Sequence, residues 1–91
     1  MMFTERRKQL RDECQIPQRV LAAALEIDTA TYCKIEKGER KTKREQVFII
    51  ANLLKADKDE LLSLWLAEQV YCVVKNEKYA DKALNIVAKK L

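Results

Sequence analysis

The stretch that most constrains the fold runs from Pro17 to Gly38, which are the only proline and the only glycine of the 91 residues. Proline is tolerated at a helix start, whereas glycine is favoured just past a helix end, where the backbone turns left-handed. Between them the apolar residues have helical spacing that is interrupted at residues 26–28, where Asp28 provides a new N-cap. The stretch therefore predicts two short helices joined by a tight turn.

The rest of the chain is also predicted to be helical. Little glycine and proline is left for β-turns, and the strong helix formers Leu, Ala, Lys and Glu are abundant, so the fold class is all-α. Counting their caps, the predicted helices cover about residues 4–14, 17–25, 28–37, 42–55, 57–74 and 77–91. A content of 48% hydrophobic and 35% charged residues fits one modest core with a solvated surface.

Four side chains are predicted to begin helices. Thr4 and Asp28 are N-caps, and two capping boxes pair Thr42 with Glu45 and Asp57 with Glu60. The acidic cluster at 57–60 has a second interpretation as a metal site. The sequence there has no EF-hand glycine, and the chain has no histidine, so capping is favoured and no metal is expected.

An ordered set of residues resembles the lambda-repressor-like (XRE-type) helix-turn-helix family. The set comprises Leu10-Arg11, Gln18, Leu21-Ala22, Leu25, Ile27, the run Ile35-Glu36-Lys37-Gly38, and Ala51-Asn52-Leu53-Leu54. The resemblance covers roughly residues 5–66 and implies a five-helix DNA-binding domain over 1–66, with an additional C-terminal helix in the extension 67–91. The family usually has glycine where this chain has Glu26, and a left-handed turn at a non-glycine residue costs about 1 kcal/mol or more.

The resemblance also implies which residues would contact DNA, with the helix 28–37 lying in the major groove. The base-contacting positions match Thr29, Ala30 and Lys34. The phosphate-contacting positions are Gln18, Thr31, Arg40, Lys41, Lys43 and Arg44. Arg11 and Glu36 match a buried ion pair that ties the first and third helices together in that family.

The charge distribution fits such a partner. The net charge is +4 and the pI is near 9.0, and residues 37–44 hold five basic residues against one acid. Residues 51–91 hold seven basic and six acidic residues, so the positive field belongs to the half with the two short helices. Double-stranded DNA is the predicted partner, and a helical protein-interaction module without DNA binding is the alternative.

The remaining features exclude other classes of protein. No Gly-rich phosphate loop and no nucleophile–base pair is visible, so neither an enzyme nor a bound cofactor or small-molecule ligand is expected. Three scattered cysteines indicate reduced thiols, with Cys33 beside the DNA-facing surface and Cys14 and Cys72 buried. Without a signal-peptide pattern or a membrane-spanning run, a cytoplasmic protein with no membrane partner is predicted.

The C-terminal third carries more apolar surface than one small domain needs. The surplus is predicted on Leu66, Val70, Tyr71, Val73, Val74, Leu84, Val87 and Leu91. Either the last helix folds back over this surface in a monomer, or the surface pairs two copies, and the sequence favours a two-fold homodimer on an inverted-repeat operator. A chain of this kind resembles restriction–modification controllers, prophage repressors and antitoxin-type autoregulators, and the sequence does not rank them.

Overall fold

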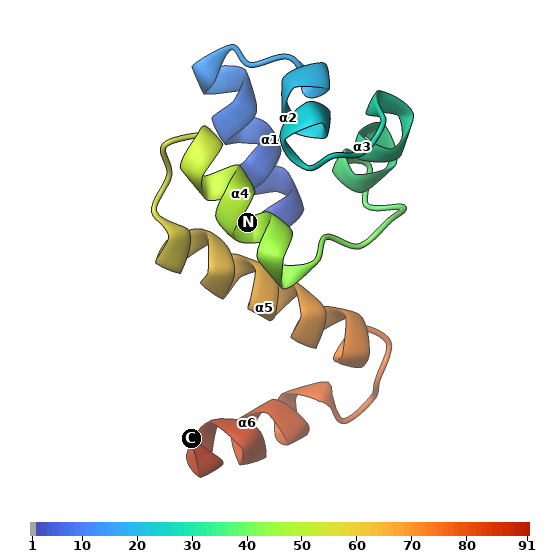
Figure 1. Ribbon diagram of the computed structural model, residues 1–91. Helices are drawn as coiled ribbons and strands as arrows, with labels where there is room; N and C mark the ends of the chain where they lie inside the picture. The colour runs from blue at the N-terminus through green and yellow to red at the C-terminus, as the bar shows by residue number, and fades with distance from the viewer. Residues whose placement is uncertain (1) are drawn as a thin grey trace.

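The structure, a computed structural model that describes residues 2–91, contains six α-helices and no strand within that range (Figure 1). The helices are α1 (Phe3–Cys14), α2 (Gln18–Ala24), α3 (Thr29–Glu36), α4 (Arg44–Leu53), α5 (Lys58–Val74) and α6 (Ala80–Lys90). The predicted all-α fold class, with five helices followed by an additional C-terminal one, is confirmed.

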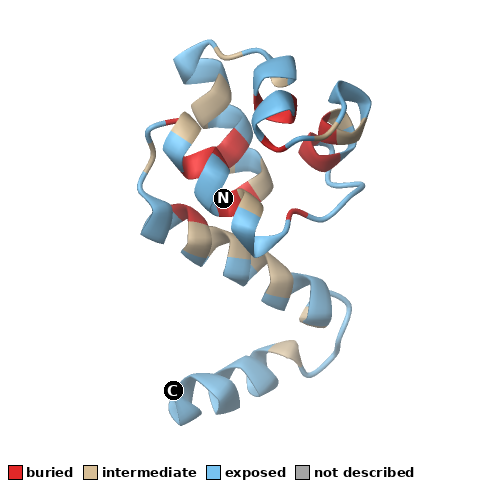
Figure 2. Ribbon diagram, viewed as in Figure 1, coloured by how far each residue is buried: buried red, intermediate tan, exposed pale blue. Residues whose placement is uncertain are grey.

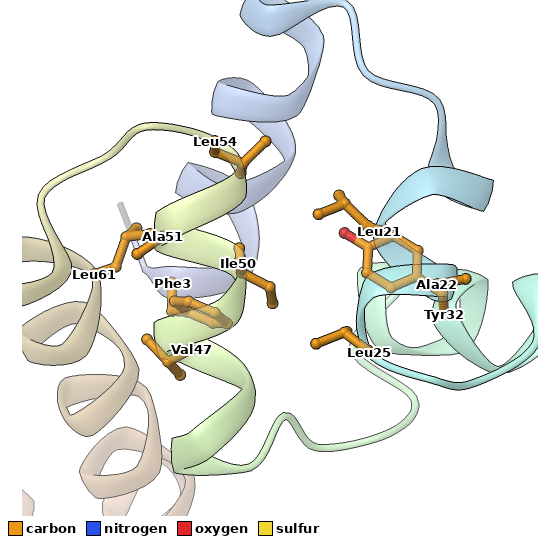
Figure 3. Close-up of a cluster of buried hydrophobic side chains, with 10 residues drawn as sticks. All are labelled: Phe3, Leu21, Ala22, Leu25, Tyr32, Val47, Ile50, Ala51, Leu54 and Leu61. Carbon is orange, nitrogen blue, oxygen red and sulfur yellow. The ribbon is translucent and has the colours of Figure 1, made fainter.

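The core is built around α4, which lies between α5 on one side and α2 on the other (Figure 3), while α1 packs against α5 and α3. One face of α4 buries Val47, Ile50 and Ala51, with Leu54 at its end, as the helical spacing predicts. The neighbouring helices contribute Phe3, Leu21, Ala22, Leu25, Tyr32 and Leu61. Full burial of one such aliphatic side chain stabilises the fold by about 1.5–3 kcal/mol, so this cluster holds the first five helices together.

The two short helices around Glu26 are held as the sequence predicts. The Asp28 carboxylate accepts a hydrogen bond from the Thr31 backbone N–H at 2.7 Å and so caps α3. Gly38 follows the end of α3 with φ +79°. Glu26 itself has φ +57°, so the left-handed turn is made without the glycine that the family usually places there.

Two predicted helix starts need correction. Thr4 lies inside α1, which begins one residue earlier, and its hydroxyl donates to Glu68 Oε1 on α5 at 2.7 Å. Thr42 is buried in the loop, and α4 is instead capped one residue later, where the Lys43 N–H donates to Gln46 Oε1 at 2.9 Å. The Thr4 contact depends on the packing of α1 against α5, whereas the cap of α4 is a local bond that begins one residue after Thr42.

The predicted capping box at the start of α5 is confirmed for Asp57 but not for Glu60. Asp57 caps the helix by accepting from the Asp59 N–H at 2.9 Å. Glu60 does not close a box, because its carboxylate pairs with Arg6 Nε on α1 at 3.2 Å.

The helix α1 is anchored by a fully buried arginine that the sequence analysis did not single out. The Arg7 guanidinium carbon lies 5.6 Å from the Phe3 ring centroid and 5.7 Å from that of Tyr32, and Nη2 donates to the Ile35 carbonyl at 3.2 Å. Burial lowers the pKa of Arg7. Arginine is among the residues least often fully buried, so the residue type at position 7 does not indicate a core position.

Arg7 therefore allows a direct test of its role. We expect Arg7→Met to leave the free energy of unfolding unchanged or higher, because an apolar chain of similar length removes the desolvation penalty of a buried charge. Arg7→Ala should instead lower it by about 2–5 kcal/mol through the cavity left behind. Urea unfolding measures both variants, and a Met variant as unstable as the Ala variant would mean that the charge itself is required.

The apolar residues of the C-terminal part of the chain remain exposed to solvent in the single chain. Figure 1 shows α6 apart from α1–α4, and Figure 2 shows that no residue of α6 is buried. Tyr71 is 51% exposed, Val87 55% and Leu91 100%. Cys14 and Cys72 are also exposed, and Cys33 is half-buried, so the predicted burial of the first two thiols is wrong for the single chain.

Candidate nucleic-acid interface

The exposed face of α3 is defined by how this helix is anchored. Tyr32, Ile35 and Glu36 are buried against the rest of the domain, which turns the opposite side of α3 outward. Thr29, Ala30 and Lys34 are all exposed on the outward side, and Lys34 lies one turn after Ala30. The three predicted base-contacting residues are thus accessible on α3, and two of them, Ala30 and Lys34, lie one turn apart.

The predicted phosphate-contacting residues lie at the start of α2, within α3 and in the segment that follows α3. Gln18 is half-buried as the first residue of α2, and Thr31 is half-buried in α3. Arg40 and Lys41 are exposed in the loop that follows α3, and Lys43 and Arg44 are exposed at the start of α4. Four of the six are therefore cations within the five residues 40–44, in the segment that follows α3.

These cations are electrostatically free to meet an external anion. Among residues 2–91, the salt bridges involve Arg6 and Arg11, and none involves a basic residue of the segment 37–44. The hydrogen bond from Thr31 lowers the pKa of Asp28, and the nearby charges of Lys34 and Arg40 lower it further. Lys34 and Arg40 are therefore close enough to Asp28 to favour its charged form.

The position of α3 depends on an ion pair with α1. Arg11 Nη2 lies 2.9 Å from Glu36 Oε1, and the two side chains are 14% and 4% exposed. Arg11 Nη1 also donates to the Ile16 carbonyl at 3.1 Å, in the connector before α2. One arginine of α1 thus fixes both the end of α3 and the entry to α2, so the two short helices keep a set orientation.

Trp65 is a further residue of this region, and the sequence analysis did not single it out. From α5 its indole Nε1–H donates to the Thr42 carbonyl at 2.7 Å, and the Arg44 guanidinium carbon lies 5.4 Å from the ring centroid. These contacts join residues 21 to 23 positions apart in the sequence. No local sequence pattern predicts such pairs.

Two short helices joined by a tight turn, with an exposed polar face on the second and free cations after it, define a helix-turn-helix DNA-binding protein. Residues 8–61, more than half of the chain, match the family model described as Helix-turn-helix. The chain belongs to the lambda-repressor-like (XRE-type) helix-turn-helix family, whose members are DNA-binding transcription regulators. No curated protein and no solved structure matches the chain significantly. Within residues 2–91, no helix has the length and apolar character needed to cross a bilayer.

Proposed function

We propose that the protein is a sequence-specific regulator that reads the major groove with α3 and binds an inverted-repeat operator as a homodimer. The observation that carries the proposal is the exposed surface of Thr29, Ala30 and Lys34, followed directly by the unpaired cations of segment 37–44. The role is that of a small cytoplasmic regulator, such as a restriction–modification controller, a prophage repressor or an antitoxin-type autoregulator. We assign it no catalytic activity and no cofactor.

The proposed base readout follows from the chemistry of three side chains. Thr29 can exchange hydrogen bonds with a base edge and can place its methyl group against thymine. Ala30 offers only apolar contact, while the Lys34 ammonium is suited to the O6 and N7 acceptors of guanine. The cations of segment 37–44 would hold neighbouring phosphates, which sets the register of α3 without reading sequence.

Lys34→Ala is expected to weaken binding to the preferred duplex by about 1–3 kcal/mol and to flatten the preference at one base pair. The preferred duplex is obtained by selection from a random DNA pool, and affinities are measured across a salt series. The matched control is Lys43→Ala, which should weaken all sequences alike and lower the salt slope by about one. An unchanged sequence preference in the Lys34 variant would show that α3 is not the reading helix.

The proposed dimer rests on an apolar groove between α5 and α6. The groove has a volume of about 470 Å³ and is lined by Ser63, Leu66, Ala67, Val70, Tyr71, Val74 and Leu84. Three further apolar residues of the C-terminal part, Val73, Val87 and Leu91, are exposed in the single chain. Contiguous apolar surfaces of this kind mark interaction sites in soluble proteins.

A second copy of the chain is the occupant that this surface fits. An isolated helix of 11 residues is marginal in water, yet α6 buries none of its residues within its own chain. Its apolar face and the groove are present in every copy, so a two-fold arrangement covers both surfaces on both chains at once. Such a dimer would place two copies of α3 about 34 Å apart, one turn of DNA.

The alternative of a protein-interaction module without DNA binding makes a different prediction. Duplex binding through free cations should fall steeply as salt rises, because counterions are released from the DNA. An interaction through apolar helices would persist or strengthen under the same conditions. Salt-insensitive binding, or no binding to any duplex at low salt, would favour the alternative.

A further inference from the structure

The loop between α3 and α4, residues 37–43, is tied at both ends and held at its centre by one contact. At its start the Gly38 N–H donates to the Ile35 carbonyl and the Glu39 N–H to the Lys34 carbonyl, at 3.0 and 2.9 Å. At its end the Lys43 N–H donates a hydrogen bond to Gln46 Oε1. For residues 40–42, the structure of residues 2–91 shows a single hydrogen bond, from Trp65 to the Thr42 carbonyl. The centre of the cationic loop therefore depends on a side chain of α5.

The Trp65 contact is a well-defined one. Its N–H···O distance is 2.7 Å, and it joins a half-buried indole to a buried residue of the loop. A partly buried indole N–H that lost its acceptor would pay a desolvation penalty, so the bond favours one loop position over the others. Arg40 and Lys41 are exposed and lie immediately before Thr42 in the loop. The position of Thr42 therefore determines where these two cations are held.

The same indole also holds Arg44, the first residue of α4. The guanidinium carbon lies 5.4 Å from the ring centroid, within range of a cation–π interaction. Arg44 takes part in no salt bridge among residues 2–91. Guanidinium donors are arranged in a rigid plane, so contact with the ring can limit the side chain's rotation while N–H groups remain for a phosphate.

We propose that Trp65 is a positioning residue for DNA binding, which holds the loop 37–43 through Thr42 and orients Arg44 toward a phosphate. The inference rests on the phosphate contacts proposed above for Arg44 and its neighbours. Leu66, the next residue of α5, lines the groove of the proposed dimer. One helix thereby supports both the proposed subunit interface and the loop that meets DNA.

The test separates the indole N–H from the aromatic ring. W65F keeps a ring and removes the donor, W65L removes both, and each variant is made with Arg44 present and in the R44A background. Because phosphate contacts do not depend on sequence, the probe is an arbitrary duplex of about three helical turns, titrated in a series of low salt concentrations. Circular dichroism melting of each variant gives its folded fraction, which corrects the affinity.

We expect W65F to bind about threefold more weakly than the wild type through the loss of the Thr42 bond. W65L should lose about a further threefold, and this second step should vanish in the R44A background, because the ring then has no guanidinium to orient. A general loss of stability would give the same second step in both backgrounds. R44A should also change the emission of the single tryptophan in the free protein, whereas K43A should not.

The outcomes distinguish the two levels of the proposal. If R44A and K43A both bind the duplex as the wild type does, the proposed phosphate contacts fail. If those variants weaken binding while W65F and W65L bind like the wild type, or if the step from W65F to W65L survives R44A, the positioning role of Trp65 is overturned. Should W65L not fold, the W65F affinity and the R44A emission decide, since wild-type affinity for W65F or unchanged emission in R44A contradicts the proposal.

Discussion

Glu36→Gln is expected to lower the free energy of unfolding by about 3–5 kcal/mol, because it removes the anion from beside a partly buried arginine. Glu36 Oε1 lies 2.9 Å from Arg11 Nη2, and the Glu36 side chain is 4% exposed. Arg11 retains Asp12 at 3.4 Å, but that carboxylate is largely solvated, with 61% exposure, and replaces Glu36 only weakly. The charge of Glu36 also favours the protonated form of the fully buried Arg7. One substitution thus weakens the electrostatic support of two guanidinium groups.

Urea unfolding at a fixed protein concentration measures this effect, since the stability of a dimer depends on the concentration of its subunits. The matched control is Glu39→Gln, which makes the same chemical change on an exposed loop residue and should stay within about 0.5 kcal/mol of the wild type. In thermal unfolding, the Glu36 variant should melt about 12 °C or more below the wild type. A melting temperature within about two degrees of the wild type would show that the pair contributes little to stability.

Leu84→Lys is expected to abolish the homodimer and to weaken binding to a full operator by about 10²–10⁴, while binding to a single half-site is unchanged. Leu84 is the residue of α6 that lines the groove with α5, and a lysine there would bring an unpaired charge into the interface. Two linked subunits bind two half-sites with a high effective concentration, which a monomer lacks. Deleting residues 67–91 should have the same effect on affinity, with some loss of stability because the Thr4–Glu68 bond is removed.

The matched control for this variant is Asn85→Lys. Asn85 follows Leu84 on the same exposed helix but does not line the groove, so the same added charge should leave the dimer intact. Sedimentation at tens of micromolar and titration with duplexes of one or two half-sites measure both variants. A wild-type protein that sediments as a monomer and binds one half-site as tightly as two would overturn the proposed assembly.

The features predictable from the sequence are those that short stretches of backbone decide. Asp28 caps α3 through a residue three positions away, and Gly38 ends the helix through its own left-handed φ. The buried face of α4 likewise follows from apolar residues three and four positions apart. These interactions are local, so the sequence by itself determined the helix-turn-helix unit, the all-α class and the family.

The tertiary structure decided the contacts between residues that are distant in the sequence. Burial of Arg7 requires the ring of Tyr32 and the carbonyl of Ile35, which α3 supplies. Thr4 does not cap α1 but donates a hydrogen bond to Glu68, 64 positions away. Trp65 of α5 likewise donates to the Thr42 carbonyl in the loop before α4. Each of these polar side chains finds its hydrogen-bond partner on another helix or loop, so the bond exists only after the elements have packed. The spacing of residues along one helix does not indicate which residues of another element will lie beside it.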